Sequence, residues 1–293
     1  MKAAVYHITN EITQDQVEAG RLQEVYDISI EAGKKVSLPS AFDSDVRSDV
    51  IRKAVRVSRA NRRQAYGSKQ QKGKKRPMPG MRHSVEWWGK GRGVSRIMRK
   101  TGQRTGAQNP HTRGGRRAHG PKVEKDWSMS MNATERRLAR DSALAATTDR
   151  DMVSARGHRF HEEIDTLPLI IGDYTEVRDE GEESMDIEVF SLEHATRKLV
   201  AILESLGLGD DLQRARNGRK VRAGKGKMRG RRHRTPKSVL VVVSQKSGLA
   251  KAGGNIPGVD VVAVKDLSAE DLAPGGDVGR LTVFTKKAVE ELA

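Results

Sequence analysis

A glycine-rich string, Gly224-Lys-Gly-Lys-Met-Arg-Gly230, has the composition of a phosphate-binding loop. Its G-x-G-x-x-x-G spacing is one residue longer than the dinucleotide fingerprint, and it follows an arginine-rich stretch instead of a strand. It is not a P-loop either, because Gly226 stands where Ser or Thr would hold magnesium and the spacing back to Gly218 is wrong. Glycines among arginines have a simpler use, since they let the backbone approach phosphates closely. The string therefore predicts nucleic-acid contact and argues against a nucleotide cofactor.

Two histidines, His158 and His161, are followed by Glu162 and Glu163 and could stand one helical turn apart. A metal site needs a third and usually a fourth ligand, and no residue at a recognised spacing supplies one. We therefore expect a structural or RNA-facing histidine pair and no metal site.

Two further strings, Arg113-Gly-Gly-Arg-Arg-Ala-His119 and Arg229-Gly-Arg-Arg-His-Arg234, are dense in arginine. Guanidinium forks bind phosphate in two-pronged fashion and stack on bases. A solvated charged face usually mixes signs, which these strings do not. They therefore predict phosphate binding.

The positive charge is concentrated in two places. The first basic segment, Arg56–Lys122, holds 20 Lys/Arg and one acid, Glu86, and the second, Arg214–Lys237, holds 12 Lys/Arg and no acid. Together they carry +31 against +17 for the whole chain, so the remaining residues carry −14. This distribution predicts an acidic body with two appendages that bind a polyanion.

Two of the three tryptophans, Trp87 and Trp88, lie inside the first basic segment. They could form a small local cluster with Val85 and Val94, or they could stack on RNA, which contributes about 1–3 kcal/mol per base. Both interpretations stay open at this point. Since only 4% of the chain is aromatic, contacts with the RNA backbone should dominate.

Several protein classes find no support. Cysteine is absent, which excludes disulfides, thiolate zinc sites and cysteine nucleophiles. The N-terminus lacks the apolar core of a signal peptide, and no apolar run approaches the roughly 18 residues of a membrane span. No Ser/His/Asp arrangement or paired-carboxylate motif can be argued from spacing. We expect no catalytic residues, no cofactor, no small-molecule substrate and a cytoplasmic location.

The elements that must position the basic segments alternate between strands and helices. Strand patterns occupy the first forty residues at Ala3–Ile8, Val25–Ile30 and Val36–Leu38. Asp43 or Ser44 can cap a helix whose apolar face comprises Val46, Val50, Ala54 and Val57. Residues 58–121 then show no sustained period and contain 11 glycines, so they predict a long extended loop.

Regular patterns resume with a helix that begins at Asn132, ends near Thr147 and has Leu138 and Leu144 as core candidates. A helix capped by Ser191 should end at Gly207. Unbroken apolar strands are expected at Leu167–Ile171, Val239–Val243, Val259–Val264 and Leu281–Phe284, and a last helix at Thr285–Leu292. The acidic run Asp173–Glu188 is interpreted as a solvated loop or as a contact for another basic protein.

This alternation predicts an α/β fold: one globular domain with a mostly parallel sheet flanked by helices, plus a long extended basic loop. Residues 1–57 and 122–293 would form the globular body. Residues 58–121 would be the inserted loop, and residues 213–237 a second basic loop within the body.

The motifs resemble those of a known family, large-subunit ribosomal protein four, in its archaeal and eukaryotic branch. The resemblance covers roughly residues 44–293. It is carried by the following strings: Ala60-Asn-Arg-Arg-Gln64, Trp88-Gly-Lys-Gly-Arg-Gly-Val94, Gly114-Gly-Arg-Arg-Ala-His119, Lys122-Val-Glu-Lys-Asp126, Arg156-Gly-His-Arg-Phe160, Gly218–Arg232, and Gly279-Arg-Leu281. The archaeal form fits better, because the chain ends with the core domain.

This resemblance implies a structural constituent of the large ribosomal subunit that binds ribosomal RNA and supports assembly. The loop would penetrate the RNA and line part of the peptide exit tunnel, with a tip around Lys69–His83 near the nascent peptide. Neighbouring large-subunit proteins would be further partners, and no membrane is involved.

The residues expected to bind ribosomal RNA are the cations, tryptophans and one histidine of the two segments. In the first they are Arg59, Arg62, Arg63, Lys69, Lys72, Lys74, Lys75, Arg76, Arg82, Trp87, Trp88, Lys90, Arg92, Arg96, Arg99, Arg104, Arg113, Arg116, Arg117 and His119. In the second they are Arg219, Lys220, Arg222, Lys225, Lys227, Arg229, Arg231, Arg232 and Arg234.

Two alternatives from other classes remain at this point. A nucleotide-dependent α/β enzyme would need a phosphate-binding glycine loop directly after a strand. A protein that coats DNA or chromatin would prefer duplex DNA over structured RNA.

Overall fold

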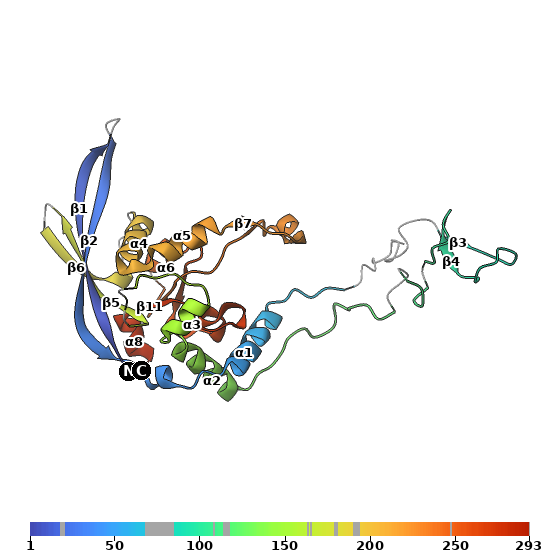
Figure 1. Ribbon diagram of the computed structural model, residues 1–293, viewed down its shortest axis with the longest axis horizontal. Coiled ribbons are helices and arrows are strands. Elements are labelled where there is room, and N and C mark those ends of the chain that lie inside the picture. The colour runs from blue at the N-terminus through green and yellow to red at the C-terminus, as the bar shows by residue number, and fades with distance from the viewer. Residues whose placement is uncertain are drawn as a thin grey trace. The chain divides into compact units, whose positions relative to one another are not determined.

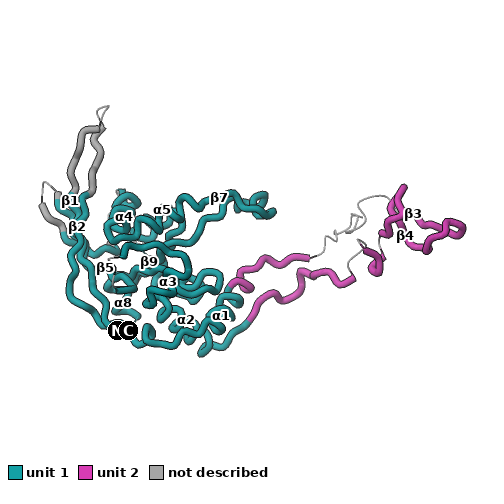
Figure 2. The backbone as a smooth tube through the Cα atoms, viewed as in Figure 1, with its two compact units in different colours: residues 1–58, 130–293 teal, residues 59–129 magenta. Residues whose placement is uncertain are grey.

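The computed structural model describes residues 1–17, 21–67, 85–107, 109–113, 118–162, 164, 166–178, 181–189, 194–246 and 248–292. The chain forms two compact units, shown in different colours in Figure 2. We call Met1–Ser58 with Ser130–Ala293 the body, and Arg59–Met129 the loop unit. The second basic segment belongs to the body. The finer division expected from the sequence, with a loop at 58–121 and another at 213–237, remains a proposal.

The body is built on one sheet with the strand order β10-β9-β11-β5-β1-β2, in which β6 also pairs with β5. The strands are β1 (Lys2–Val17), β2 (Arg21–Ser37), β5 (Leu169–Arg178), β6 (Gly181–Asp186), β9 (Leu240–Val243), β10 (Asp260–Ala263) and β11 (Thr282–Thr285). The four pairings from β10 to β1 are parallel, while β1–β2 and β5–β6 are antiparallel hairpins. The predicted mostly parallel sheet is therefore confirmed (Figure 1).

Helices cover both faces of this sheet (Figure 1). They are α1 (Ser48–Asn61), α2 (Ala133–Ala145), α3 (Arg150–Ala155), α4 (Ala195–Leu203), α5 (Gly209–Asn217), α6 (Gly248–Gly253), α7 (Ala269–Leu272) and α8 (Lys286–Leu292), with a π-helical turn at Glu204–Leu208. Short 3-10 turns lie at Ser40–Asp43, Ile187–Val189, Lys225–Arg229, Val264–Asp266 and Pro274–Gly276. The α/β fold predicted from the alternation is thus the one observed.

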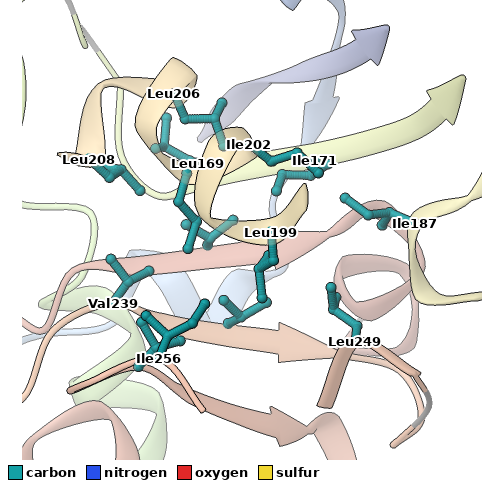
Figure 3. Packing of buried hydrophobic residues seen from close by; sticks show 14 of the residues in the cluster. Leu169, Ile171, Ile187, Leu199, Ile202, Leu206, Leu208, Val239, Leu249 and Ile256 are labelled. Atoms are coloured by element: carbon teal, nitrogen blue, oxygen red, sulfur yellow. The ribbon is translucent and has the colours of Figure 1, made fainter. Parts of the chain in front are cut away.

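Neighbouring residues of each central strand point to opposite faces, and both faces are apolar. Leu169 and Ile171 pack in one buried cluster with Leu199 of α4 (Figure 3). Ile170 between them packs in the other cluster, with Ile51 of α1. A strand buried on both sides needs an unbroken apolar run, which explains the pattern seen in the sequence.

The first forty residues form two long strands and not the three short ones expected. β1 and β2 pair as a hairpin from Lys2–Ser37 to Val17–Arg21. The interpretation of Asp173–Glu188 as a solvated loop is wrong, because most of this run lies in the β5–β6 hairpin. Glu176 is even buried, where it pairs with the buried Lys198 of α4.

The predicted helices occur, with changes in their bounds and faces. The first begins at Ser48, after the expected caps, and it buries Ile51 and Val55 in place of the expected apolar face. In α2, Leu144 is buried as expected, but Leu138 is exposed. Besides Leu144, the buried residues of α2 are the small Ala139, Ser142, Ala143 and Ala145.

Gly207 was expected to end a helix, and it has a positive φ of 78° within the π-helical turn. The backbone leaves the helical path at this residue and makes a kink, as expected of a glycine that ends a helix, and a new helix, α5, begins at Gly209. The expected cap Ser191 lies outside the described residues. The turn therefore directs the chain into α5, the helix that leads to the second basic segment.

Candidate nucleic-acid interface

The second basic segment is an ordered hairpin. Its short strands β7 (Lys220–Val221) and β8 (His233–Arg234) pair antiparallel, and the backbone N–H of Arg222 donates to the carbonyl of Arg232 at 2.9 Å. The 3-10 turn Lys225–Arg229 forms the end of the hairpin and stops at Gly230, whose φ of 79° favours glycine. The glycine string thus builds a turn in a hairpin and does not follow a strand of the parallel sheet.

Most cations of this hairpin point into solvent. Exposed are Arg219, Lys220, Lys225, Lys227, Arg229, Arg231, Arg232 and Arg234. Arg222 is half-buried, and its guanidinium donates to the carbonyls of Arg231 and His233. Within the described part of the chain, no carboxylate forms a salt bridge with any of these nine residues. Unpaired guanidinium groups on a fixed backbone are suited to phosphate oxygens.

The base of the hairpin is fixed by Asp211, a fully buried residue in the first turn of α5. Its carboxylate accepts hydrogen bonds from His158 Nδ1 (3.1 Å), from the backbone N–H of Arg159 (3.0 Å) and from Arg214 Nε (2.9 Å). Ser238 Oγ, two residues before β9, donates another at 2.6 Å. Asp211 thereby joins both ends of the second basic segment to the body.

Burial alone would raise the pKa of Asp211, but hydrogen bonds from His158, Arg214 and Ser238 outweigh it and hold this pKa well below its usual range. Burial also lowers the pKa of His158, and the hydrogen bond to Asp211 offsets this only in part. A neutral imidazole that donates from Nδ1 to a carboxylate fits both shifts.

Arg280 forms the second anchor and is almost completely buried. It donates to the carbonyls of Ser238 (3.0 Å) and Asp271 (2.8 Å) and to the carboxylate of Asp260 (2.5 Å). Asp260 also accepts from Lys237 at 2.7 Å, at the end of the basic segment. Since the buried Arg280 is paired with Asp260, it serves the fold and is not available to RNA.

The two histidines have separate environments. His158 is buried and bonded to Asp211, so the structural interpretation of that residue is confirmed and an RNA-facing role is wrong for it. His161 is exposed. Among the described residues, no group of three His, Cys, Asp or Glu side chains could hold a metal ion.

The loop unit contains a small folded module. Strands β3 (Val85–Trp87) and β4 (Met98–Lys100) pair antiparallel, and the N–H of Ala107 donates to the carbonyl of Met98 at 2.8 Å. Arg99 is buried in this module and donates to the carbonyls of Ser95 and Arg104. Its side chain therefore has partners within the module.

The two neighbouring tryptophans differ. Trp87 is 70% exposed, so no local cluster covers it. Trp88 is half-buried, with the guanidinium carbon of Arg92 4.6 Å and that of Arg99 5.4 Å from its ring centroid. The contacts seen at Trp88 are thus with arginines and are not the expected cluster with Val85 and Val94, while Trp87 is open for contact.

Other predicted loop residues that the structure describes are exposed: Arg59, Arg62, Arg63, Lys90, Arg92, Arg96, Arg104, Arg113 and His119. The remaining ones lie outside the described residues: Lys69, Lys72, Lys74, Lys75, Arg76, Arg82, Arg116 and Arg117. The expected tip at Lys69–His83 also lies there.

Sequence reasoning missed one feature of the loop unit, the stacking of Tyr66 on Trp127. Trp127 comes directly after the string Lys122–Asp126, and Tyr66 stands two residues after Ala60–Gln64. Two aromatic residues near the two ends of the first basic segment were the available signal.

No helix in the described part of the chain is both long enough and apolar enough to cross a bilayer.

Comparisons with known proteins agree with the sequence motifs. Residues 36–293 match the model of a family described as "Ribosomal protein L4/L1 family". The chain is 40% identical over 269 residues to "Large ribosomal subunit protein uL4" of Halobacterium salinarum, covering 92% of this chain and 98% of the relative. Proteins of the same name from Methanococcoides burtonii and Methanocaldococcus jannaschii are 41% and 42% identical over 268 residues, which is 92% of this chain and 96% of each relative.

Proposed function

The chain belongs to the ribosomal protein L4/L1 family, in its archaeal form, and on that premise we propose that its two basic segments bind the RNA of the large ribosomal subunit. The protein is a structural constituent of that subunit and not an enzyme. It accordingly functions in the ribosome, in the cytoplasm. Membership of this family also argues against the alternative of a nucleotide-dependent α/β enzyme.

One observation carries the RNA-binding proposal. The hairpin 219–234 presents eight exposed cations on an ordered backbone, and none of them has a carboxylate partner among the described residues. In the interior, by contrast, Arg214 and Arg280 are paired with Asp211 and Asp260. A chain that pairs its interior cations but leaves those of one hairpin free has a surface suited to a polyanion.

The loop unit supports the finer parts of the proposal. Residues 58–121 would extend into the ribosomal RNA, where their glycines allow close approach to phosphates and Trp87 contacts RNA. In the assembled subunit this loop would line part of the peptide exit tunnel and meet the nascent peptide near its tip. Neighbouring large-subunit proteins and a role in assembly complete the proposal, and the acidic part of the body, outside the second basic segment, would face away from RNA.

The salt dependence of RNA binding tests this function. If about ten cations of the loop meet phosphates, the logarithm of the affinity for large-subunit ribosomal RNA should fall with the logarithm of salt concentration at a slope of about −7. Equilibrium binding of a labelled transcript at four or more salt concentrations measures this slope.

Duplex DNA of equal length is the matched competitor. An affinity for the ribosomal RNA that does not change with salt, or a preference for the duplex, contradicts the proposal.

A further inference from the structure

Tyr66 and Trp127, from the two ends of the loop unit, form an aromatic pair. Their ring centroids are 4.8 Å apart and their planes differ by 28°. The guanidinium carbon of Arg63 lies 4.6 Å from the Trp127 centroid and 5.3 Å from that of Tyr66, and its Nη2 donates to Tyr66 Oη at 3.3 Å. We call these three residues the clasp. Stacked rings with an adjacent guanidinium attract one another, so the clasp exists without RNA.

The backbone on both sides of the clasp is held in place. The side-chain Oδ1 of Asn61 accepts a hydrogen bond from the backbone N–H of Met129 at 2.8 Å. Beyond the aromatic pair, Gly67 lies so close to Val123 that an added Cβ would stand 2.9 Å from Val123 Cγ2. The two ends of the loop unit are therefore fixed against each other around the clasp.

The clasp has unused binding capacity. Tyr66 is 48% exposed although Trp127 stacks on its ring and Arg63 lies beside it, which leaves about half of the residue accessible to a further ligand. The indole Nε1 of Trp127 is shielded from solvent and has no acceptor in the described part of the chain. An open aromatic face beside a guanidinium fits a flat ring that is attached to an anion.

The surrounding charges favour the same ligand. Lys125 Nζ lies 5.4 Å from the Trp127 centroid, and Arg62 and Lys122 are exposed nearby in the sequence. The carboxylate of Asp126 accepts hydrogen bonds from Ser128, at 2.9 Å from its N–H and 2.6 Å from its hydroxyl. A nucleotide combines the required flat ring with a phosphate.

We propose that the clasp is a stacking site for one unpaired nucleobase of RNA, which lies on the open face of Tyr66 while Arg63 binds the phosphate of the same nucleotide. This site rests on the proposed function and names one contact within it. Aromatic side chains stack on bases that are splayed out of RNA helices, and a preformed clasp loses little conformational freedom on binding.

Two substitutions separate stacking from charge. Tyr66→Leu removes the ring, and we expect it to weaken binding of the large-subunit RNA transcript by roughly 5- to 150-fold. Tyr66→Phe keeps the ring and should bind within about twofold of the parent protein, because stacking requires only the aromatic face. Neither change removes a charge, so the salt slope should stay the same in both.

Ultraviolet crosslinking of the parent protein to the same transcript, followed by mass spectrometry, detects direct contact with RNA. A clasp with a purely structural role would give no such crosslink. We expect a nucleotide adduct on Tyr66. Unchanged affinity of Tyr66→Leu, or no adduct on the peptide that holds Tyr66, overturns the stacking site. If the slope of log affinity against log salt concentration is then still near −7, the proposed function stands. Salt-independent binding by every variant contradicts the proposed function and the site together.

Discussion

Replacing Asp211 with alanine is expected to lower the free energy of unfolding of the body by about 3–5 kcal/mol, the usual cost of removing one partner from a buried ion pair. The carboxylate accepts hydrogen bonds from His158, Arg159, Arg214 and Ser238. Its loss leaves buried donors without acceptors. Thermal or urea unfolding, followed by circular dichroism at pH 7, measures the difference.

The effect should depend on pH with a definite sign. Because the pKa of Asp211 is lower in the folded than in the unfolded protein, its stabilisation is complete above the unfolded value of 3.8 and is lost as pH falls below it. The difference between the parent protein and Asp211→Ala should therefore be largest near neutrality and shrink toward pH 3.

His158 adds to the same trend in the parent protein. Burial lowers the pKa of His158, so below about pH 6.5 the unfolded chain binds a proton at this residue that the folded chain does not bind. In this range the free energy of unfolding therefore decreases as the pH decreases. Asp210→Ala is the matched control, because the neighbouring Asp210 is exposed in the same helical turn. Equal stability of Asp211→Ala and Asp210→Ala at pH 7 would contradict this account of the hairpin base.

Replacing Arg229, Arg231, Arg232 and Arg234 with glutamine is expected to weaken binding to large-subunit RNA by about 10²-fold at 0.15 M salt. Without these four phosphate contacts, fewer counterions are released when the RNA binds. The slope of log affinity against log salt concentration should therefore become less steep by about 3. All four side chains are exposed, and the body should unfold as before. Equilibrium binding over a range of salt concentrations measures both quantities.

The control for that prediction removes four charges elsewhere on the body. Lys34, Lys35, Arg197 and Lys251 are exposed and lie outside both basic segments. Their replacement by glutamine changes the net charge by the same amount. If the two quadruple variants lose affinity equally, binding follows the net charge of the protein and the hairpin is not its site.

The sheet and both basic segments could be predicted because each leaves a strong local signal. Val239–Val243 is apolar at every position, as a strand covered on both faces must be. The basic segments were visible as runs of one sign. These features depend on neighbours in the sequence and need no knowledge of distant contacts.

The anchors of the second segment could not be predicted in the same way. Asp210 and Asp211 look alike in the sequence, and only the packing of α5 makes one exposed and the other buried. A signal did exist, because Asp211 stands three residues after the buried Leu208 and four before the buried Ala215. That spacing places Asp211 on the apolar face, where a carboxylate must have partners.

The burial of Arg99 could not be predicted from its residue type. It is expected to bind RNA like the other arginines of its segment, yet it is buried with carbonyl partners in the β3–β4 module. The clasp was missed because Tyr66 and Trp127 are some sixty residues apart and meet only in the folded loop unit. Contacts between distant residues leave little trace in a single sequence.

Lysine reactivity in the assembled particle tests the central claim most directly. Large subunits that contain the protein would be isolated by sedimentation and acetylated, and mass spectrometry would compare each lysine with the free protein. We predict that Lys90, Lys225 and Lys227 are protected in the subunit, while Lys34 and Lys251 on the body react as they do in the free protein. Equal reactivity of Lys90, Lys225 and Lys227 in the subunit and in the free protein would contradict the binding of ribosomal RNA by the two basic segments.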